Sequence, residues 1–476
     1  MLNDGFSPDS VTFACILKAC GSIGAIEKGE QIHAEIRKQG LLNKGIVLGT
    51  SLVDMYAKCR LLNKAQQVFD VLPVRNVVTW NALITGYVQH GHSNEALNCF
   101  ARMQNEGFSP NAVTYAIILK ACGSLGLIEK GEEIHAEVRK QGLLKDNIIL
   151  GNALVDLYAK CNLLARAREF FDALPIRNVI SWNALIAGYV QGGHNNEALD
   201  CFQRMQDEGI FPDTITFACT LKACSSIGSL EKGEEIHNEI GKQGLLDKNP
   251  IMLGTALVDM YAKCGALAKA QEVFDKLSIQ DTISWNTLMT GYAQQGQSHS
   301  TLNAYQMMEI EGICPEEVSL VCMLSACSHA GSWYETQRLI AEMSTKYGIS
   351  LTVEHHTCMV VVFGLAGHFD EAMSVIKIMP SSDHVEIWLA LLDACRRWGN
   401  VKAAVSIFYH ILQLDASCSA AYILLADVFG AAGMEEDAKK VEAMRLKYAV
   451  SKKRGHSMWD DAGEIDHSLS KDIFAK

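Results

Sequence analysis

The strongest constraint on the fold is a short phrase that returns at a spacing of 102 residues. MQNEGFSPN spans Met103–Asn111, and MQDEGIFPD spans Met205–Asp213. The chain opens with the end of this phrase, and a fourth version, MEIEGICPE, spans Met308–Glu316, one residue later than the spacing requires. This pattern is typical of a repeat protein, in which stacked units share a continuous core and length counts units. We expect residues 1–9 to be the tail of a truncated repeat.

The 102-residue block divides into three unequal units that return in a fixed order. Long units of 36 or 37 residues are Ser10–Gly45, Ala112–Asn147, Thr214–Pro250 and Glu317–Thr352. Short units of 31 or 32 residues are Ile46–Asn76, Ile148–Asn178, Ile251–Asp281 and Val353–His384. Intermediate units of 35 residues are Val77–Asn111, Val179–Asp213 and Thr282–Glu316. Residues 10–384 are therefore expected to form one array of repeats.

Each unit has the pattern of two short helices. In the unit that begins at Val77, the apolar residues Trp80, Leu83 and Ile84 fall on one helical stripe. Gly91 is suited to end this helix, and Asn94 is suited to cap a second one. Two helices of this length cannot bury their stripes alone, so they must stack on neighbouring units. The sequence predicts an all-α solenoid.

Composition narrows the functional classes. The formal charge of -12 argues against a general phosphate-binding surface, so any nucleic-acid binding must depend on specific contacts. No apolar run reaches the roughly eighteen residues that a membrane span needs, so no membrane partner is expected. The sixteen cysteines include no CxxC pair and recur in register, which favours buried reduced thiols over disulfides or a zinc site.

A family resemblance rests on these units. VVTWNALITGYVQHGHSNEALNCFARMQNEGFSPN resembles a pentatricopeptide repeat (PPR), and the alternating lengths resemble the plant PLS subclass, whose units are called P, L and S. LKACGSLGLIEKGEEIHAEVRKQG in the long units resembles the L motif, and NALVDLYAKC in the short units resembles the S motif. The resemblance covers the chain to about residue 455. It implies a right-handed α-solenoid superhelix of stacked helix-turn-helix repeats.

The C-terminal part of the sequence bears on whether the protein is an enzyme. Residues 385–455 resemble two E motifs, which the family uses for protein contacts, and residues 456–476 resemble a degenerate E+ segment. Many relatives continue into a DYW domain, a zinc cytidine deaminase that needs HxE and PCxxC. This sequence has no PCxxC, and its HxE triplets at His33, His135 and His237 share one phase of three long units. That repetition favours a structural role, so we expect no enzyme activity, no metal site and no cofactor.

The resemblance implies sequence-specific binding of single-stranded RNA, with about one base read per unit by its fifth and last residues. The pairs carried over are Thr50 with Asn76, Asn81 with Asn111, Asn152 with Asn178, Asn183 with Asp213, Thr255 with Asp281, and Asn286 with Glu316. In the family, Asn with Asp prefers uridine, Thr with Asp guanosine, Thr with Asn adenosine, and Asn with Asn a pyrimidine. Residues 46–281 then predict 5′-A-Y-N-Y-U-N-G, where Y is a pyrimidine and N any base.

Plainer interpretations of the same residues exist. A terminal Asn or Asp before a helix is a common N-cap, and an Asn in a first turn can face water. The fifth residues of the long units have no amide or hydroxyl to offer a base; they are Ala14, Ala116, Ala218 and Val321. One lysine in each YAKC phrase is a candidate phosphate contact or an ordinary solvated side chain; these are Lys58, Lys160 and Lys263.

The resemblance as a whole implies a site-recognition factor for organellar C-to-U RNA editing. Its partners are then a single-stranded transcript, a deaminase supplied in trans and other editing factors through the E region. Location in the mitochondrion or chloroplast is implied, with a transit peptide expected upstream of Met1. Two alternatives stay open. An organellar RNA stabilisation or processing factor would use the same array, and a tetratricopeptide-like protein scaffold would use similar helix pairs but favours about 34 residues per unit.

Overall fold

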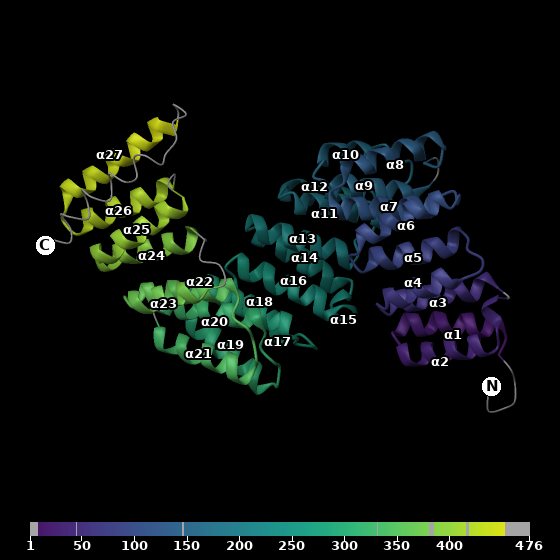
Figure 1. Ribbon diagram of the computed structural model, residues 1–476, viewed down its shortest axis with the longest axis horizontal. Coiled ribbons are helices and arrows are strands. Elements are labelled where there is room, and N and C mark those ends of the chain that lie inside the picture. Colours follow the sequence, from purple (N-terminus) through teal and green to yellow (C-terminus); the bar gives the residue numbers. More distant parts are fainter. Residues whose placement is uncertain are drawn as a thin grey trace. The chain divides into compact units, whose positions relative to one another are not determined.

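The computed structural model describes residues 8–43, 45–144, 147–330, 332–379, 385–415 and 418–452. All regular structure in these segments is helical, which confirms the predicted all-α class. The chain divides into an N-terminal body that ends at Leu245 and a C-terminal body that begins at Leu246 (Figure 1).

In the N-terminal body each unit supplies two helices. The long units form α1 (Ser10–Ile23) with α2 (Ile26–Lys38), α7 (Ala112–Leu125) with α8 (Ile128–Lys140), and α13 (Thr214–Ile227) with α14 (Leu230–Lys242). The short units form α3 (Ile46–Lys58) with α4 (Leu62–Val71), and α9 (Ile148–Lys160) with α10 (Leu164–Asp172). The intermediate units form α5 (Val77–Gln89) with α6 (Ser93–Asn105), and α11 (Val179–Gln191) with α12 (Asn195–Asp207). A short 3-10 helix, η2 (Leu41–Asn43), follows α2.

The C-terminal body repeats this organisation. Its first three units form α16 (Pro250–Lys263) with α17 (Leu267–Asp275), α18 (Thr282–Gln294) with α19 (Ser298–Ile310), and α20 (Glu317–Ala330) with α21 (Trp333–Lys346). The remaining pairs are α22 (Val353–Leu365) with α23 (Phe369–Ile378), α24 (Val385–Trp398) with α25 (Val401–Leu414), and α26 (Ser419–Ala431) with α27 (Glu435–Lys452). The four-residue helix α15 (Leu245–Lys248) precedes α16.

Stacking of the pairs follows one rule within each body. The first helix of a unit packs on the first helix of the next unit, as in the run α1, α3, α5, α7, α9, α11 and α13. In the N-terminal body each second helix packs against its own partner, and those from α2 to α12 also contact the first helix of the next unit. Each apolar stripe is thereby buried by the following unit, and this arrangement is an α-solenoid (Figure 1).

Small residues set how closely neighbouring first helices approach. A Cβ added to Gly86 in α5 would lie 2.5 Å from Cβ of Ala57 in α3, a distance that real side chains do not tolerate. The adjoining core holds an edge-to-face contact between Phe69 and Trp80, with ring centroids 4.5 Å apart and the tryptophan fully buried. Gly86 and Trp80 belong to an intermediate unit, and their partners Ala57 and Phe69 belong to the preceding short unit. The packing therefore depends on the order in which the unit types alternate.

Unit boundaries drawn from the sequence coincide with helix starts in ten of the eleven units. The exception is α16, which begins one residue early at Pro250, because proline is well suited to the first position of a helix. The expected cap at Asn94 was wrong, since α6 begins at Ser93 with His92 at its N-cap position. Residues 1–7 of the expected repeat tail and the expected E+-like segment 456–476 lie outside the described residues.

Candidate nucleic-acid interface

Three of the six predicted polar pairs are joined by a direct hydrogen bond. The fifth residue lies in the first turn of its helix, and the last residue lies just before the first helix of the next unit. The amide nitrogen of the fifth residue donates to Oδ1 of the last residue, at 3.2 Å for Asn81 and Asn111, 3.2 Å for Asn152 and Asn178, and 2.9 Å for Asn183 and Asp213. Stacking thus brings together side chains that are 26 or 30 residues apart in the chain.

The other three predicted pairs share no direct hydrogen bond in the described structure. Thr50 Oγ1 donates to the carbonyl of Ile46 at 2.9 Å instead of contacting Asn76. Thr255 Oγ1 is buried without a partner. Asn286 bonds to a serine hydroxyl, and the side chain of Glu316 makes no bond to it. In the two pairs with a Thr, the shorter side chain makes no bond to the last residue, whereas the longer Asn does so in the three bonded pairs.

The last residues are also helix caps, as the plainer interpretation holds. In five of them Oδ1 accepts a hydrogen bond from the backbone N–H three residues later, at 2.9 to 3.1 Å. The five are Asn76, Asn111, Asn178, Asp213 and Asp281. In three of the pairs the same Oδ1 also receives the amide of the fifth residue. Capping and pairing are therefore compatible functions of one atom.

Capping fixes which atom of the last side chain faces outward. Because Asn111 must present Oδ1 to the helix, its Nδ2 group points away from the cap as a hydrogen-bond donor. Asp213 caps in the same way, so its Oδ2 points away as an acceptor. Asn111 is exposed and Asp213 is half-buried, whereas the paired Asn81 and Asn183 are each only 8% exposed. The last residue therefore offers the more accessible polar atom of each pair.

Sequence reasoning missed a buried hydroxyl at the third position of the three intermediate units and of three of the four long units. Thr114 and Thr216 are fully buried, and their Oγ1 atoms bond to the fifth residue of the preceding unit at 2.7 and 2.5 Å. The sequence carried a signal, because a Thr or Ser three residues after an Asn or Asp is the mark of a reciprocal cap. The contact to the preceding unit, which spans 33 residues, was not visible in that local pattern.

Sequence reasoning also missed a row of exposed apolar side chains at the second position of ten of the eleven units; the eleventh has Glu354 there. These side chains are between 46% and 68% exposed: Val11, Val47, Val78, Val113, Ile149, Ile180, Ile215, Met252, Ile283 and Val318. They immediately precede the third residue of each unit and lie off the helical stripe that forms the core. An apolar residue outside the stripe at the same phase of ten units is a signal that could have identified them, because single exposed apolar residues do not recur in register by chance.

The candidate phosphate-binding lysines are already paired. Lys58, Lys160 and Lys263 each form an ion pair with the aspartate one turn earlier, at 2.7, 2.7 and 2.9 Å. Lys160 and Asp156 are about one-third exposed, so the pair is only partly screened by solvent. These lysines lie at the C-terminal ends of α3, α9 and α16. A phosphate would have to compete with the aspartate for each ammonium group.

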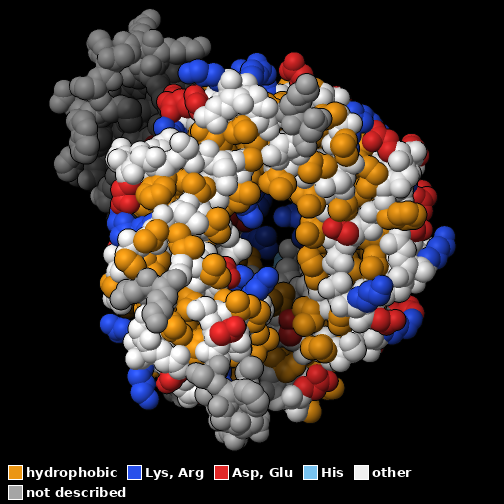
Figure 2. Space-filling model, turned by 90° about the vertical axis from the view of Figure 1, so that its right-hand side faces the viewer, with side chains coloured by type: hydrophobic (Ala, Val, Ile, Leu, Met, Phe, Trp, Pro, Cys, Tyr) orange, Lys and Arg blue, Asp and Glu red, His pale blue; other side chains and the backbone are white. Residues whose placement is uncertain are grey.

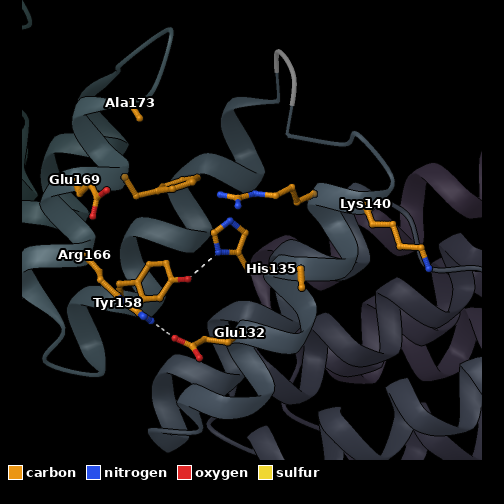
Figure 3. A pocket seen from close by; sticks show the side chains of 10 residues that line it. Glu132, His135, Lys140, Tyr158, Arg166, Glu169 and Ala173 are labelled. Carbon is orange, nitrogen blue, oxygen red and sulfur yellow. Dashed lines mark hydrogen bonds and ion pairs between the residues drawn. The ribbon is translucent and has the colours of Figure 1, made fainter.

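The HxE triplets contribute to packing between units. Nδ1 of His135 lies 2.7 Å from the Tyr158 hydroxyl, at the floor of a cavity of about 700 Å³ (Figure 3). Burial, and then the nearby Arg139, lowers the pKa of His135. The carboxylate of Glu137 accepts a hydrogen bond from Gln141 at 2.7 Å. Within one triplet the histidine and the glutamate therefore serve different neighbours.

The same cavity recurs 102 residues earlier in the N-terminal body. There Nδ1 of His33 lies 2.9 Å from the hydroxyl of Tyr56, and burial raises the pKa of Tyr56 to about 12. A neutral imidazole beside an un-ionised phenol fits a packing contact. Further along, His355 and His356 are buried and bond to the carbonyls of Glu317 and Thr352.

Surface charge is mixed in sign. Figure 2 shows Lys and Arg side chains interspersed with Asp and Glu over the face turned to the viewer, in keeping with the formal charge of -12. The sixteen cysteines are free thiols, and burial raises the pKa of Cys99 to about 11. Among the described residues no group of His, Cys, Asp or Glu is arranged to hold a metal ion. No described helix combines the length and apolar character needed to span a bilayer.

Comparison with known proteins places the repeats in a family. The PPR repeat family matches residues 75–124 and 177–226, and the PPR repeat matches residues 50–77, 113–143, 255–278, 283–313, 354–384 and 386–415. Pentatricopeptide repeat-containing protein At2g13600 of Arabidopsis thaliana is 36% identical, over 98% of this chain and 72% of the relative. A second Arabidopsis relative, At1g06140, named mitochondrial, is 34% identical over 95% of this chain and 80% of its own length. Other relatives are named chloroplastic.

A solved structure agrees with the fold. The crystal structure of the pentatricopeptide repeat protein PPR10 in complex with an 18-nt psaJ RNA element has a TM-score of 0.54 to this chain. The two are 17% identical, and the likeness covers 94% of this chain and 75% of the other. The family match and the sequence identity of the relatives show that this chain belongs to the pentatricopeptide repeat family.

Proposed function

We propose that the protein binds single-stranded RNA in a sequence-specific manner and that its short and intermediate units each read one base. The observation that carries this proposal is the fixed polar pair, in which capping holds one outward atom of known hydrogen-bonding type. Membership of the PPR family supports it, as does the RNA in the crystal structure of PPR10. The negative net charge requires such specific contacts, because general attraction for phosphate is weak.

The outward atom distinguishes bases by the ring nitrogen on their Watson–Crick edge. Uracil carries an N–H at N3, which can donate a hydrogen bond to Oδ2 of Asp213. Cytosine has a bare N3, which can accept from Nδ2 of Asn111. The second N–H of Asn183, not used by Asp213, can donate to a pyrimidine carbonyl. Pairs with a terminal Asn, at Asn81 and Asn152, therefore read cytidine, and the pair of Asn183 with Asp213 reads uridine.

Purine reading follows from the shorter Thr at the fifth position. Thr leaves room for a larger base, and the last residue again tests the ring nitrogen. Guanine has an N–H at N1, which suits Asp281 beside Thr255, and adenine has a bare N1, which suits Asn76 beside Thr50. The proposed tract read by residues 46–281 is 5′-A-C-N-C-U-N-G, with the long units unspecified.

The exposed aliphatic side chains complete the proposed binding site. They stand one residue before the buried third position, next to each polar pair, so a base that meets the pair has an aliphatic group within reach of its face. Val78 and Val113 flank the pair of Asn81 with Asn111 in this way along the chain. Contact with such a face is insensitive to base identity, so these residues supply affinity and the polar pairs supply selectivity.

The cellular role that fits this chemistry is a site-recognition factor for organellar C-to-U RNA editing. In this proposal the units are of the PLS subclass, and helices α24 to α27, with the residues to 455, form the E-type region that recruits a deaminase acting in trans. Relatives named mitochondrial or chloroplastic support an organellar location. The same array bound tightly to a transcript would also protect it from nucleases, so stabilisation is the second role to test.

The base code is tested by Asn183→Thr. This change should shift the preference at the base facing Asp213 from uridine to guanosine, because the shorter side chain makes room for a purine. We expect a change of about 1–3 kcal/mol, as for one good contact between a side chain and a base. Titration against U and G versions of one oligonucleotide at fixed salt would show it. Identical ranking by both proteins would leave Asp213 with its capping role alone.

The editing role is tested by removing residues 385–476. Editing in cells should be lost while the affinity for RNA stays largely intact, since the proposed base-reading pairs all precede residue 317. Circular dichroism of the shortened chain is the folding control, because α22 packs on α24. An equal loss of RNA affinity would contradict a recruiting role for this region.

A further inference from the structure

The long units hold a buried hydroxyl where they meet the preceding intermediate unit. Three junctions of this kind are described, and each shows the same contact. The hydroxyl at the third position of the long unit donates to Oδ1 of the preceding fifth asparagine, at 2.7 Å from Thr114 to Asn81, 2.5 Å from Thr216 to Asn183, and 2.6 Å from Ser319 to Asn286. All three hydroxyl-bearing residues are 0% exposed.

The hydrogen bonds around Thr216 form a closed set. The Thr216 hydroxyl donates to Asn183 Oδ1 and accepts from the N–H of Asp213 at 3.1 Å. Nδ2 of Asn183 donates to Asp213 Oδ1 at 2.9 Å, and the same Oδ1 accepts the N–H of Thr216 at 2.9 Å. Only one N–H of Asn183 and Oδ2 of Asp213 stay outside the set. These are the two atoms that the proposed function assigns to the base.

We propose that the third-position hydroxyl of a long unit is a positioning residue that fixes the base-reading amide of the unit before it. The inference rests on the proposed function. It gives the long units a part in base reading even though their own fifth residues, such as Ala116 and Ala218, carry no hydrogen-bonding group. A long unit would thus sharpen the selectivity of its neighbour rather than read a base itself.

The physical reason is the angular precision that base reading needs. An amide held only by its Nδ2 bond can rotate, and misplacement by about 0.5 Å or 10–20° is enough to lose a productive contact. A second bond at Oδ1 restricts this rotation, because both ends of the amide are then held. Burial strengthens the restriction, since a displaced Oδ1 would find no water as a substitute partner.

Two of the three junctions between short and intermediate units provide a natural contrast; at the third, the Thr79 hydroxyl lies 2.9 Å from that of the preceding fifth residue, Thr50. The Ser181 hydroxyl donates to the carbonyl of Asn178 at 2.9 Å, and Oδ1 of Asn152 is buried without a partner. The Ser284 hydroxyl likewise bonds to the carbonyl of its own cap residue at 2.8 Å, and Thr255 Oγ1 has no partner. These two fifth residues are held less firmly, so their units should discriminate between bases less sharply.

Thr216→Val is the direct test, because it removes the hydroxyl and keeps the shape of the side chain. Thr216→Ser restores the hydroxyl. Thr220→Val is the matched control, since Thr220 is equally buried on the same helix but bonds only to the carbonyls of Thr216 and Phe217. Each protein is titrated at one salt concentration against two oligonucleotides carrying 5′-A-C-N-C-U-N-G or the same tract with G in place of U, because the fifth residue is the one proposed to separate a pyrimidine from a purine.

The expected result is a loss of discrimination at that one base. Thr216→Val should lower the ratio of U affinity to G affinity by roughly tenfold, the size of one good base contact. Thr216→Ser and Thr220→Val should keep the wild-type ratio. A ratio unchanged in Thr216→Val, or an equal loss of affinity for both RNAs, would overturn the inference and leave Thr216 with a structural role. If the wild type itself ranks U and G equally, the proposed base reading fails first.

A gain-of-contact variant keeps the inference testable even if Thr216→Val does not fold. Ser181→Thr adds a methyl group that limits rotation of χ1, and the threonines at this position that follow a complete unit, Thr79, Thr114 and Thr216, bond to the preceding fifth residue. It should raise the preference for C over A at the base facing Asn152 by about threefold, a fraction of one full base contact. An unchanged preference would count against positioning by this hydroxyl.

Discussion

The start of α13 and the start of α11 share one capping geometry but use their buried hydroxyls differently. At α13 the Thr216 hydroxyl reaches back to Asn183 in the preceding unit. At α11 the Ser181 hydroxyl turns to the carbonyl of its own cap, Asn178, and Oδ1 of Asn152 is left unpaired. Two polar pairs joined by the same kind of hydrogen bond therefore differ in how firmly the fifth asparagine is held.

This difference indicates that, under the proposed function, a repeat does not read its base independently of the next unit. One unit supplies the fifth residue and, at its end, the capping residue. The next unit supplies the hydroxyl at its third position. Threonine favours the contact because its branched Cβ restricts χ1, whereas serine is free to choose the nearer carbonyl. Of the three serines at this position, Ser181 and Ser284 donate to the carbonyl of their own cap residue, and Ser319 donates to the preceding fifth asparagine.

The largest expected effect comes from Asp213→Asn at the firmly held junction. The asparagine should still cap α13 through Oδ1, because Asn and Asp are equally good caps. Its outward atom becomes a donor, so the preferred base should change from uridine to cytidine by about 1–3 kcal/mol. Competition between two labelled oligonucleotides would measure this, with Asn111→Asp as the reciprocal control. If neither substitution changes the preferred base, the outward atom does not read RNA.

The next effect is on local stability and compares the two junction types directly. Thr114→Val leaves Oδ1 of Asn81 and the N–H of Asn111 without partners, which should cost about 1–3 kcal/mol. Ser181→Ala should cost only about 1 kcal/mol, because Oδ1 of Asn152 is already unpaired. Amide hydrogen exchange in the first turns of α7 and α11 reports these values. Equal losses at both helices would show that the hydroxyls are energetically equivalent.

Most of the fold could be predicted from the repeat alone. Lengths and phases located ten of eleven first helices at their first residue, because a cap residue, an apolar stripe and a terminal glycine recur in most units. The miss at Asn94 is instructive. Its unit offers His92, Ser93 and Asn94 in succession, and local propensity alone cannot decide which of them begins the helix.

The candidate site was predictable only in part. Polar pairs such as Asn183 with Asp213 could be located by phase, because both residues repeat at fixed positions. The role of Thr216 could not, because its contact spans 33 residues and depends on how a hydroxyl rotates. The exposed aliphatic residues, for example Ile180, were present in the pattern but do not fit the amphipathic stripe used to identify helices. Reasoning from core periodicity overlooks residues outside the buried stripe, and these are the residues that we propose to contact RNA.

The smallest expected effect separates attraction for phosphate from base reading on α9, which begins near the loosely held Asn152 and ends at Lys160. Asp156→Asn removes the ion pair with Lys160 and frees the ammonium group for RNA, at a cost in stability of about 0.3–0.5 kcal/mol. Affinity should rise equally for all sequences, and the slope of log affinity against log salt should steepen by about 0.7 if one phosphate contact is gained. Titrations at several salt concentrations with the cytidine and uridine oligonucleotides would measure the affinity and its salt dependence. Asp200→Asn on helix α12 is the control for the change in net charge. A steeper slope in both variants would trace the effect to net charge. A changed preference between the two RNAs would instead place Lys160 close enough to the base facing Asn152 to influence its recognition.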